Sequence, residues 1–383
     1  MLTKSIALLL TSLVALVPAP PSGRPPIGPL KRVDPKLHDL TFGVLIATQL
    51  QQAVSGEGNA YATRENYNLV DAPIAMPLVY QSTFSRMDPE SVTAQLWLDA
   101  KPQNPKLTIK ENLPFSTALG VMTIGRFTGQ SVRWQVGYRL QTWSSVIDDT
   151  KAGQIAWPKE WPKEVQDGLK PQMFIESDDP VFKETVERVS EGKLRLVPPY
   201  YAAKDLIRYA ILNIQTSGDG VDHGAQGQIR GMEVLGAKEA ATSGLGTPHD
   251  LVCVCVAILR AANIPARPVI GVQESPKNGK NEFVTWAEFY LPDCGWIPFD
   301  PFVMRGKGIR QLDVRKPWPE LGTMDDLNER IPLAYHFIPA ATIESPQNAA
   351  VWGWDPRPGG TSTSEQAVTI GIVSRGKGVE DPQ

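Results

Sequence analysis

The chain has 383 residues, of which 42% are hydrophobic and 21% charged, and a formal net charge of -3. This length exceeds the roughly 250–300 residues at which a single core stops growing, so we expect two domains. The near-neutral charge gives no electrostatic basis for binding a polyanion, so neither nucleic acid nor an anionic membrane surface is an expected partner.

The N-terminus has the layout of a secretory signal peptide. Lys4 is followed by an uncharged run from Ser5 to Val17 and then by Pro18-Ala19-Pro20. This run is too short to span the roughly 30 Å core of a bilayer comfortably, which favours export over an uncleaved anchor. We therefore predict a signal peptide at residues 1–19, no further transmembrane segment, and a periplasmic or extracellular location.

The next part of the chain predicts a linker and then a β-sandwich. Prolines crowd residues 20–37, which is typical of an extended linker. In residues 38–150 apolar and polar side chains alternate, most clearly from Val132 to Thr142, as in half-exposed antiparallel strands. The segment from Leu40 to Leu50 fits a strand or a helix equally well. Repeated short strands of this kind indicate an antiparallel β-sandwich.

A second domain is predicted at residues 179–356, after a proline- and tryptophan-containing connector at residues 151–178. It opens with apolar residues at helical spacing, first from 181 to 189 and then from about 199 to 216. The last segment, residues 357–383, is rich in Gly, Ser and Thr and is expected to be a tail.

The centre of this second domain predicts one buried helix followed by a sheet. Thr247 is placed to cap the helix, with Pro248 at its first position and Asp250 three residues after the cap. The stretch Leu251 to Leu259 is apolar on every face, so the helix should be buried. Three short strands follow, which gives an α+β domain with a helix packed on an antiparallel sheet. The expected strands are 267–272, 282–291 and 296–299, with a polar hairpin at 274–280 between the first two.

The cysteines and histidines do not predict a metal or cofactor site. Cys253 and Cys255 are two apart in the expected helix and point to different sides, and Cys294 leaves an odd number, so no disulfide framework is implied. We expect all three to be small buried apolar residues. The four histidines show no spacing typical of a zinc site.

Three motifs in residues 246–301 resemble the transglutaminase-like superfamily, which has the papain-like fold. Residues 260–267 read Arg-Ala-Ala-Asn-Ile-Pro-Ala-Arg, like the exit of the family's catalytic helix. Residues 286–288 read Trp-Ala-Glu and residues 295–301 read Gly-Trp-Ile-Pro-Phe-Asp-Pro, like the two strands that follow it. The resemblance covers residues 178–305 and implies that fold behind an N-terminal β-sandwich.

The resemblance also implies where a catalytic triad would lie. In the family, a cysteine at the start of the buried helix is the nucleophile, a histidine on the next strand is the base, and an aspartate orients the histidine. Carried over by register, these positions are Pro248, Val284 and Asp300. The resemblance further implies that Trp286, Glu288 and Trp296 line the cleft.

Two of these positions cannot perform the family's chemistry, because proline has no nucleophile and valine accepts no proton. The alternative is a relocated nucleophile at Cys253 with His249 or His336 as base, although a thiol in an apolar helix should have a raised pKa. We expect His249 to be a solvent-facing residue of the first helical turn.

Asp300 is the only triad position that keeps its residue type. With no histidine to orient, we expect it to be structural, either capping a helix or pairing with Arg260 or Arg267. This expectation and the missing nucleophile both predict a protein that has the family's fold but not its reaction.

The sequence therefore predicts an exported transglutaminase-like pseudoenzyme that binds peptide or protein segments in the family's cleft, or acts as a scaffold. The alternative is an active cysteine-dependent protease or acyltransferase that uses Cys253. A third interpretation is a purely structural component of the cell envelope. Selective labelling of Cys253 separates the first two, and the presence of an open apolar cleft separates the third.

Overall fold

The structure is a computed structural model and describes residues 26–48, 50–54, 60–113, 115, 117–224, 227–274, 280–337, 353–354 and 366–378. The expected signal peptide and the turn of the expected hairpin at 274–280 lie outside the described residues. Within these ranges, no helix is both long and apolar enough to cross a membrane.

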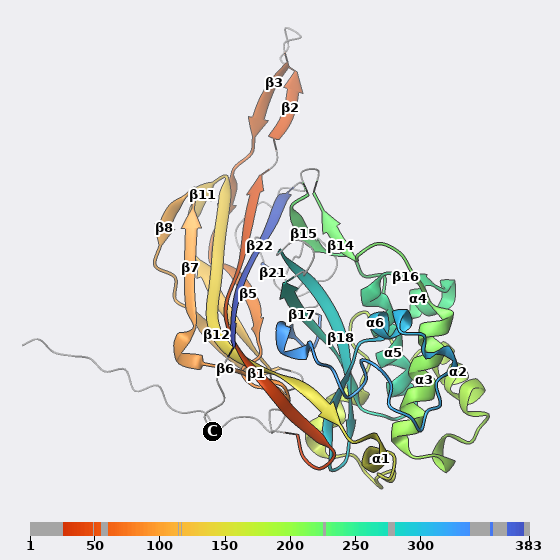
Figure 1. Cartoon of the computed structure of the whole chain (residues 1–383). Helices are drawn as coiled ribbons and strands as arrows, with labels where there is room; N and C mark the ends of the chain where they lie inside the picture. The colour runs from red at the N-terminus through yellow and green to blue at the C-terminus, as the bar shows by residue number, and fades with distance from the viewer. Residues whose placement is uncertain are drawn as a thin grey trace, which may run out of the picture.

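One half of the molecule is built from strands and the other half from helices packed on a second sheet (Figure 1). The large sheet of the first half is antiparallel, and β6 (Ser85–Met87) joins it by pairing with β12. The other strands, in sheet order, are β14 (Val221–His223), β15 (Ile229–Met232), β22 (Gln366–Gly378), β1 (Leu30–Thr48), β12 (Ser131–Ile147), β7 (Thr93–Leu98) and β8 (Lys101–Gln103).

The predicted alternation is present in β12. Its side chains at Val132, Trp134 and Val136 are buried, while Arg133 and Arg139 are exposed. The segment that fitted either a helix or a strand is the strand β1, which pairs with β12 along almost its whole length. A smaller sheet completes the sandwich. Its strands, in order, are β21 (Gly353–Trp354), β5 (Ala72–Leu78), β10 (Thr117–Ile124) and β9 (Thr108–Leu113).

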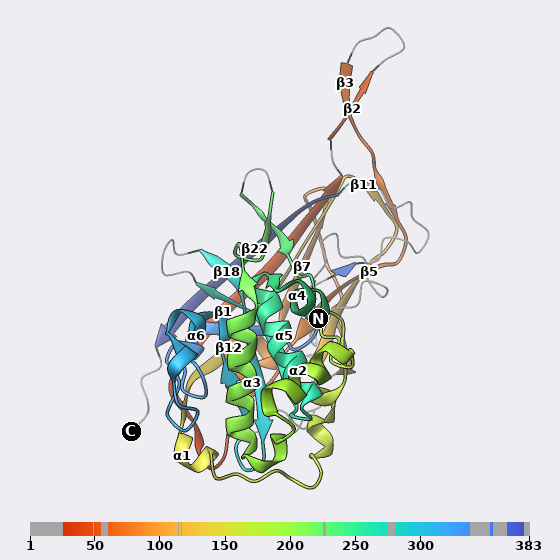
Figure 2. The ribbon, with the colours of Figure 1, turned by 90° about the vertical axis from the view of Figure 1, so that its right-hand side faces the viewer.

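Two short ribbons extend the sandwich. One pairs β2 (Leu50–Val54) with β3 (Ala60–Arg64) and projects well beyond the rest of the molecule (Figures 1 and 2). The other pairs β4 (Tyr67–Leu69) with β11 (Phe127–Gly129).

The expected linker at 20–37 and the expected tail at 357–383 each contain part of a long strand. β1 begins at Leu30, and the 13 residues of β22 fill about half of the second segment. The two strands pair with each other from Lys36↔Gly378 to Thr48↔Gln366. Composition indicates that such segments are extended, but it does not encode a partner more than three hundred residues away, so the bounds of the linker and of the tail stay predictions.

The helices of the second half begin where the sequence predicts. Asp179 caps α2, and Thr247 caps α5 through a capping box with Asp250. α3 ends at Asn213, slightly earlier than expected, because the next residues form a short strand. The helices are α1 (Asp149–Ala152), α2 (Pro180–Ser190), α3 (Pro199–Asn213), α4 (Ala237–Ser243), α5 (Pro248–Ala261) and α6 (Pro301–Gly306). That short strand, β13 (Gln215–Thr216), pairs in parallel with β16 (Leu245–Gly246).

α5 is the central element of this half. Every side chain from His249 to Arg260 is buried, as the uninterrupted apolar run predicts. The helix contacts α2, α3, α4 and α6 and packs on β17 and β18 of a four-stranded antiparallel sheet. The strands of this sheet, in order, are β19 (Gly295–Phe299), β18 (Asn281–Leu291), β17 (Ala266–Glu274) and β20 (Arg330–Ala334). The predicted α+β class, with a helix packed on a sheet behind a β-sandwich, is confirmed.

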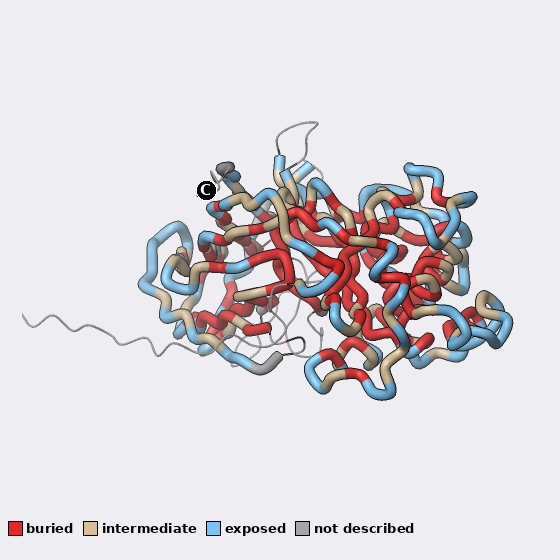
Figure 3. The backbone as a smooth tube through the Cα atoms, turned by 60° about the horizontal axis from the view of Figure 1, so that its bottom comes forward, coloured by how far each residue is buried: buried red, intermediate tan, exposed pale blue. Residues whose placement is uncertain are grey.

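The two halves share one hydrophobic core. Nearly all buried apolar residues form one contiguous cluster that runs from the sandwich to α5, and only Ala75 and Val121 form a separate one. Figure 3 shows buried backbone continuing across the molecule. Phe42 of β1 packs against Phe283 of β18 with ring centroids 6.4 Å apart. β15 also joins the large sheet, through the pair Ile229↔Ile370. The boundaries 38–150 and 179–356 therefore remain a prediction, since no break in the core marks them.

Candidate functional site

The N-terminus of α5, where the resemblance places a nucleophile, is closed by the protein itself. Thr247 Oγ1 accepts from the Asp250 amide at 3.2 Å, and Asp250 Oδ2 accepts from the Thr247 amide at 2.8 Å. The other oxygen, Asp250 Oδ1, accepts from the amides of Leu235 at 2.8 Å and Gly236 at 2.9 Å. The negative charge that suits a helix N-terminus is thus supplied by a fixed carboxylate, in place of a reactive thiolate.

Pro248 and Val284, which the resemblance assigns to the nucleophile and the base, offer no acid, base or nucleophile. Pro248 is the first residue of α5 and is half-buried. Val284 lies opposite Gly271 in the β17–β18 ladder and packs against the core. Thr285, its neighbour on the opposite face of β18, is the residue that contacts the first turn of α5.

His249 is buried, with 2% of its surface exposed, so the expectation that it faces solvent was wrong. Its Nδ1 lies 2.9 Å from Thr285 Oγ1. The ring is covered by Gly220, where an added Cβ would come within 2.7 Å of Nε2. Gly220 also has a φ of +74°, which favours glycine. Burial lowers the pKa of His249 to about 4, so the imidazole is neutral near pH 7.

The alternative nucleophile, Cys253, lies wholly inside the core with no exposed surface. Burial, with a smaller contribution from Asp250, raises the pKa of Cys253 well above its ordinary value. Burial also raises the pKa of Cys255, and that of Cys294 to about 12. All three thiols are free and buried, as the sequence predicts.

The second histidine of the alternative site, His336, lies just beyond β20, the edge strand farthest from β19. Burial lowers its pKa to about 4. Among the residues that the structure describes, no hydrogen bond joins Cys253 to His249 or His336. The structure therefore does not bring this alternative set together.

Asp300 has a structural role, as expected, but with a different partner. Its Oδ1 caps α6 by accepting from the amides of Phe302 and Val303, both at 3.0 Å. Its Oδ2 accepts from Arg330 Nη1 at 2.6 Å, and Arg330 Nη2 also donates to Asp326 at 3.0 Å. Burial opposes the charge of Arg330, but the two carboxylates outweigh it and raise its pKa. The carboxylate that the resemblance assigns to orienting an imidazole pairs here with a guanidinium, which cannot act as a base.

Arg260, the first of the two expected partners of Asp300, stabilises the exit of α5. It donates to the carbonyl oxygens of Ala266 at 2.8 Å and Lys170 at 2.5 Å, and to Gln172 Oε1 at 3.0 Å. These contacts attach the 151–178 connector to the turn after the helix.

Arg267, the second expected partner, is fully buried against Glu288. Its Nε and Nη2 lie 2.7 and 2.6 Å from Glu288 Oε2. Its guanidinium carbon lies 3.7 Å from the ring centroid of Tyr335 and 4.2 Å from that of Trp296. Burial raises the pKa of Glu288, although Arg267 opposes that shift.

The three residues expected to line a cleft do not face an open one. Trp286, Glu288 and Trp296 are each only 3% exposed. The sandwich covers this face of the sheet: Phe115 packs edge-on against Trp296, with centroids 6.1 Å apart, and a loop at residues 82–85 faces the other two. The space left there is about 10 Å³ and admits no peptide. One face of β18 packs on α5. Because the sandwich covers the other face, this apolar strand is buried on both sides.

A larger hollow, which the sequence does not mark, lies beside the N-terminus of α5. It is a groove of about 500 Å³ between the end of α3, β13 and the segment after α6. β13 pairs with β16, which leads directly into the cap residue Thr247. Arg305 forms one wall, with Nη1 donating to Thr216 Oγ1 at 2.7 Å. No single stretch of sequence could identify this groove, because three separate segments build it.

The structure indicates no metal centre in the part of the chain that it describes. Within those ranges, no three His, Cys, Asp or Glu side chains cluster in a way that could hold a metal ion.

Comparison with known proteins agrees with this architecture. A family model described as the transglutaminase-like superfamily matches residues 187–301. A solved structure of a candidate cysteine protease from Cytophaga hutchinsonii is 12% identical, with a TM-score of 0.54 over 92% of this chain and 94% of that one. The periplasmic domain of TgpA from Pseudomonas aeruginosa is 14% identical, with a TM-score of 0.31 over 71% of this chain and 91% of that one.

Comparison with curated proteins gives no match. The family match lies on the segment that carries the three sequence motifs and contains α5 and the strands packed on it. Residues 187–301 are therefore similar to the transglutaminase-like superfamily, and the rest of the chain lies outside that match.

Proposed function

We propose that the protein is an exported transglutaminase-like protein without catalytic activity, which acts by binding peptide or protein segments. The observation that carries the proposal is the state of the three triad positions. Pro248 and Val284 bring no reactive group, and the carboxylate of Asp300 is engaged by Arg330 at 2.6 Å. Acyl transfer by a cysteine enzyme needs an activated thiolate and a base within hydrogen-bond reach.

The burial of Cys253 supports the same proposal. A nucleophilic thiol must reach its substrate and lose its proton near neutral pH. Cys253 has no exposed surface, and its raised pKa keeps it protonated. An active enzyme that uses Cys253 is therefore the weaker candidate, and it becomes one outcome of the labelling experiment below.

The groove beside α5 supports a binding role. We propose that peptide or protein segments bind in this groove. Leu212 and Ile309 give it apolar walls, and Arg305 and Arg310 give it positive charge. We infer that it takes an extended segment with both apolar and acidic side chains. Its open volume favours binding over a purely structural role. Export rests on the sequence pattern of residues 1–19.

Alkylation of the folded protein tests catalytic inactivity. We expect no adduct after a short incubation with iodoacetamide at pH 7.5, and three adducts after unfolding in urea, since the chain has 3 cysteines. Intact mass and peptide mapping would measure both. Fast, selective labelling of Cys253 in the folded protein, lost in Cys253→Ala, would overturn the proposal in favour of a cysteine enzyme.

Peptide binding tests the groove separately. Peptides that alternate leucine with glutamate, immobilised beside lysine-containing versions, would serve as probes. We expect the acidic set to bind and Arg310→Glu to abolish the preference. Arg126→Glu, at an exposed position on the sandwich, is the matched control and should leave binding unchanged. Equal binding of both peptide sets would refute the assigned chemistry.

A further inference from the structure

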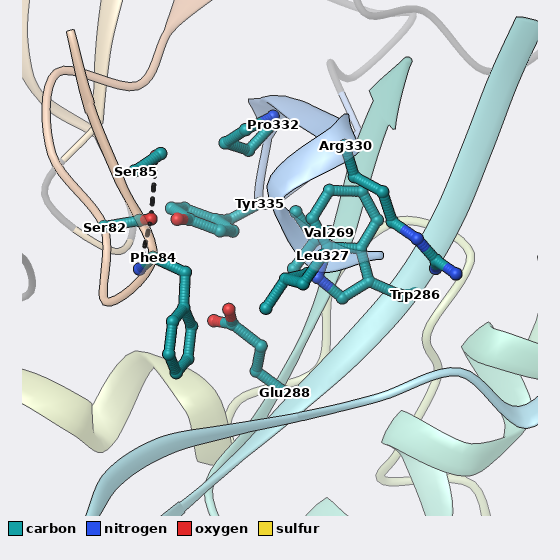
Figure 4. A pocket seen from close by; sticks show the side chains of 10 residues that line it. All are labelled: Ser82, Phe84, Ser85, Val269, Trp286, Glu288, Leu327, Arg330, Pro332 and Tyr335. Atoms are coloured by element: carbon teal, nitrogen blue, oxygen red, sulfur yellow. Dashed lines mark hydrogen bonds between the residues drawn. The ribbon is translucent and has the colours of Figure 1, made fainter. Parts of the chain in front are cut away.

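A small buried cavity lies where the sandwich meets the sheet under α5. Ser82 and Ser85 reach it from the sandwich, Trp286 and Glu288 from β18, and Tyr335 from the end of β20 (Figure 4). All five side chains are buried. The cavity measures about 10 Å³, which is the room that one water molecule needs.

Two wholly enclosed donors of this cavity, Nε1 of Trp286 and Oη of Tyr335, have no partner at full hydrogen-bond geometry among the described residues. The Ser82 side chain lies beside Tyr335 and lowers the pKa of its hydroxyl, against the larger rise that burial causes. A third donor without a partner in the described structure, Nε of Arg330, belongs to another residue that lines the cavity. In Figure 4 the Tyr335 hydroxyl points towards Ser82, and the indole nitrogen of Trp286 faces the same space as the Glu288 carboxylate. Buried donors of this kind are almost always satisfied by protein or by ordered water.

Among the described residues, the neighbouring polar groups do not supply acceptors at full hydrogen-bond geometry for these two donors. Ser82 Oγ already contacts Ser85 Oγ at 2.8 Å and accepts from the Phe84 amide at 3.1 Å. Glu288 gives one carboxylate oxygen, Oε2, to Arg267. Arg330 also lines the cavity, but its guanidinium points away towards Asp300 (Figure 4).

We propose that this cavity binds a single structural water molecule. The water accepts hydrogen bonds from Trp286 Nε1 and Tyr335 Oη and donates to the carboxylate of Glu288. A site for buried water must be polar, must offer two to four partners and must have room for one molecule, and this cavity meets all three conditions. The volume excludes a larger ligand.

This water would lie at the boundary between the two halves of the protein and bind to one of them. Its partners belong to the sheet under α5, while the opposite cavity wall belongs to the sandwich, to Ser82, Phe84 and the first residue of β6, Ser85. Dry apolar contact alone would leave both donors unpaired in a low-dielectric site. The proposal does not depend on the proposed function.

A high-resolution crystal structure of the full chain tests the proposal directly. We expect one electron-density peak within about 3.2 Å of Trp286 Nε1, Tyr335 Oη and a Glu288 oxygen. An empty cavity would overturn it. So would a direct Tyr335–Ser82 hydrogen bond together with a dry site.

A pair of hydroxyl deletions tests it in solution. Tyr335→Phe removes a partner of the water and should lower the urea midpoint of unfolding. Tyr138→Phe is the matched control, because Tyr138 Oη is also buried without a partner in the described structure but does not line the cavity. We expect that control to keep or raise the midpoint. If Tyr335→Phe also kept or raised the midpoint, no water would be bound there.

Discussion

Arg330 Nη1 donates to Asp300 Oδ2 at 2.6 Å, and both side chains are buried. This pair occupies the carboxylate that the resemblance assigns to orienting a catalytic histidine. Arginine stays protonated at any pH at which the protein is folded, so it neutralises the aspartate permanently. The result is a buried ion pair that holds β20 to the start of α6.

Removing the arginine should destabilise the fold strongly. Arg330→Met leaves Asp300 buried without its counter-charge, and we expect a loss of about 3–5 kcal/mol in the free energy of unfolding. Urea titration followed by tryptophan fluorescence would measure it. Asp326→Asn removes only the partner that is 43% exposed and should cost less than about 1 kcal/mol. Similar losses in both variants would contradict this account.

A cysteine at the first position of α5 should be reactive where the native thiols are not. Pro248→Cys places a half-exposed thiol at a helix N-terminus, which lowers its pKa. We expect one iodoacetamide adduct on the folded variant and none on the native protein. We expect no peptide hydrolysis, because Val284 is not a base. An unreactive thiol in the Pro248→Cys variant, or turnover without a histidine, would count against this interpretation of the site.

The carboxylate of Asp250 should be a major determinant of the stability of α5. It accepts from three backbone amides, those of Leu235, Gly236 and Thr247. Asp250→Ala leaves these donors unpaired, and we expect a loss of about 2–4 kcal/mol by urea unfolding. Asp250→Asn keeps an acceptor oxygen and should lose less. The reverse order would indicate that the capping box is unimportant.

Stability should fall on acidification partly because of His249. Its folded pKa is about 4 and its unfolded value is near 6.5, so the unfolded state binds the proton first. The free energy of unfolding that neutral His249 contributes is fully present above about pH 6.5. It decreases by up to about 3 kcal/mol as the pH falls towards 4. His249→Gln should show a flatter stability curve between pH 6.5 and 4 than the native protein. Parallel curves would show that His249 does not titrate abnormally.

The local elements of the second half could be predicted from the sequence because their signals are local. The cap at Thr247 and the apolar run after it define α5, and the motif ending in Asp300 defines the strand before α6. The alternation in β12 likewise defines an exposed and a buried face. Periodicity and capping each act within a few residues, so they can be recognised in a single chain.

The errors concern contacts between distant segments. His249 was expected in solvent because helix position alone does not reveal that the Gly220 loop covers it. Trp286 was expected in a cleft because strand pattern does not reveal that the sandwich lies on that face. The arginine that pairs with Asp300 is not the predicted one for the same reason, because Arg330 lies in β20, which follows Asp300 in the chain.

The position of β22 has a consequence for how the protein is made. This strand is inserted between β1 and β15 in the large sheet, although it is the last element that the structure describes. The ribosome releases residues 366–378 only after all preceding residues have been synthesised. Until then, the edge of β1 that pairs with β22 stays unpaired. Pairing across such a sequence separation is slow to form. Folding of the large sheet should therefore finish only after residues 366–378 have been synthesised.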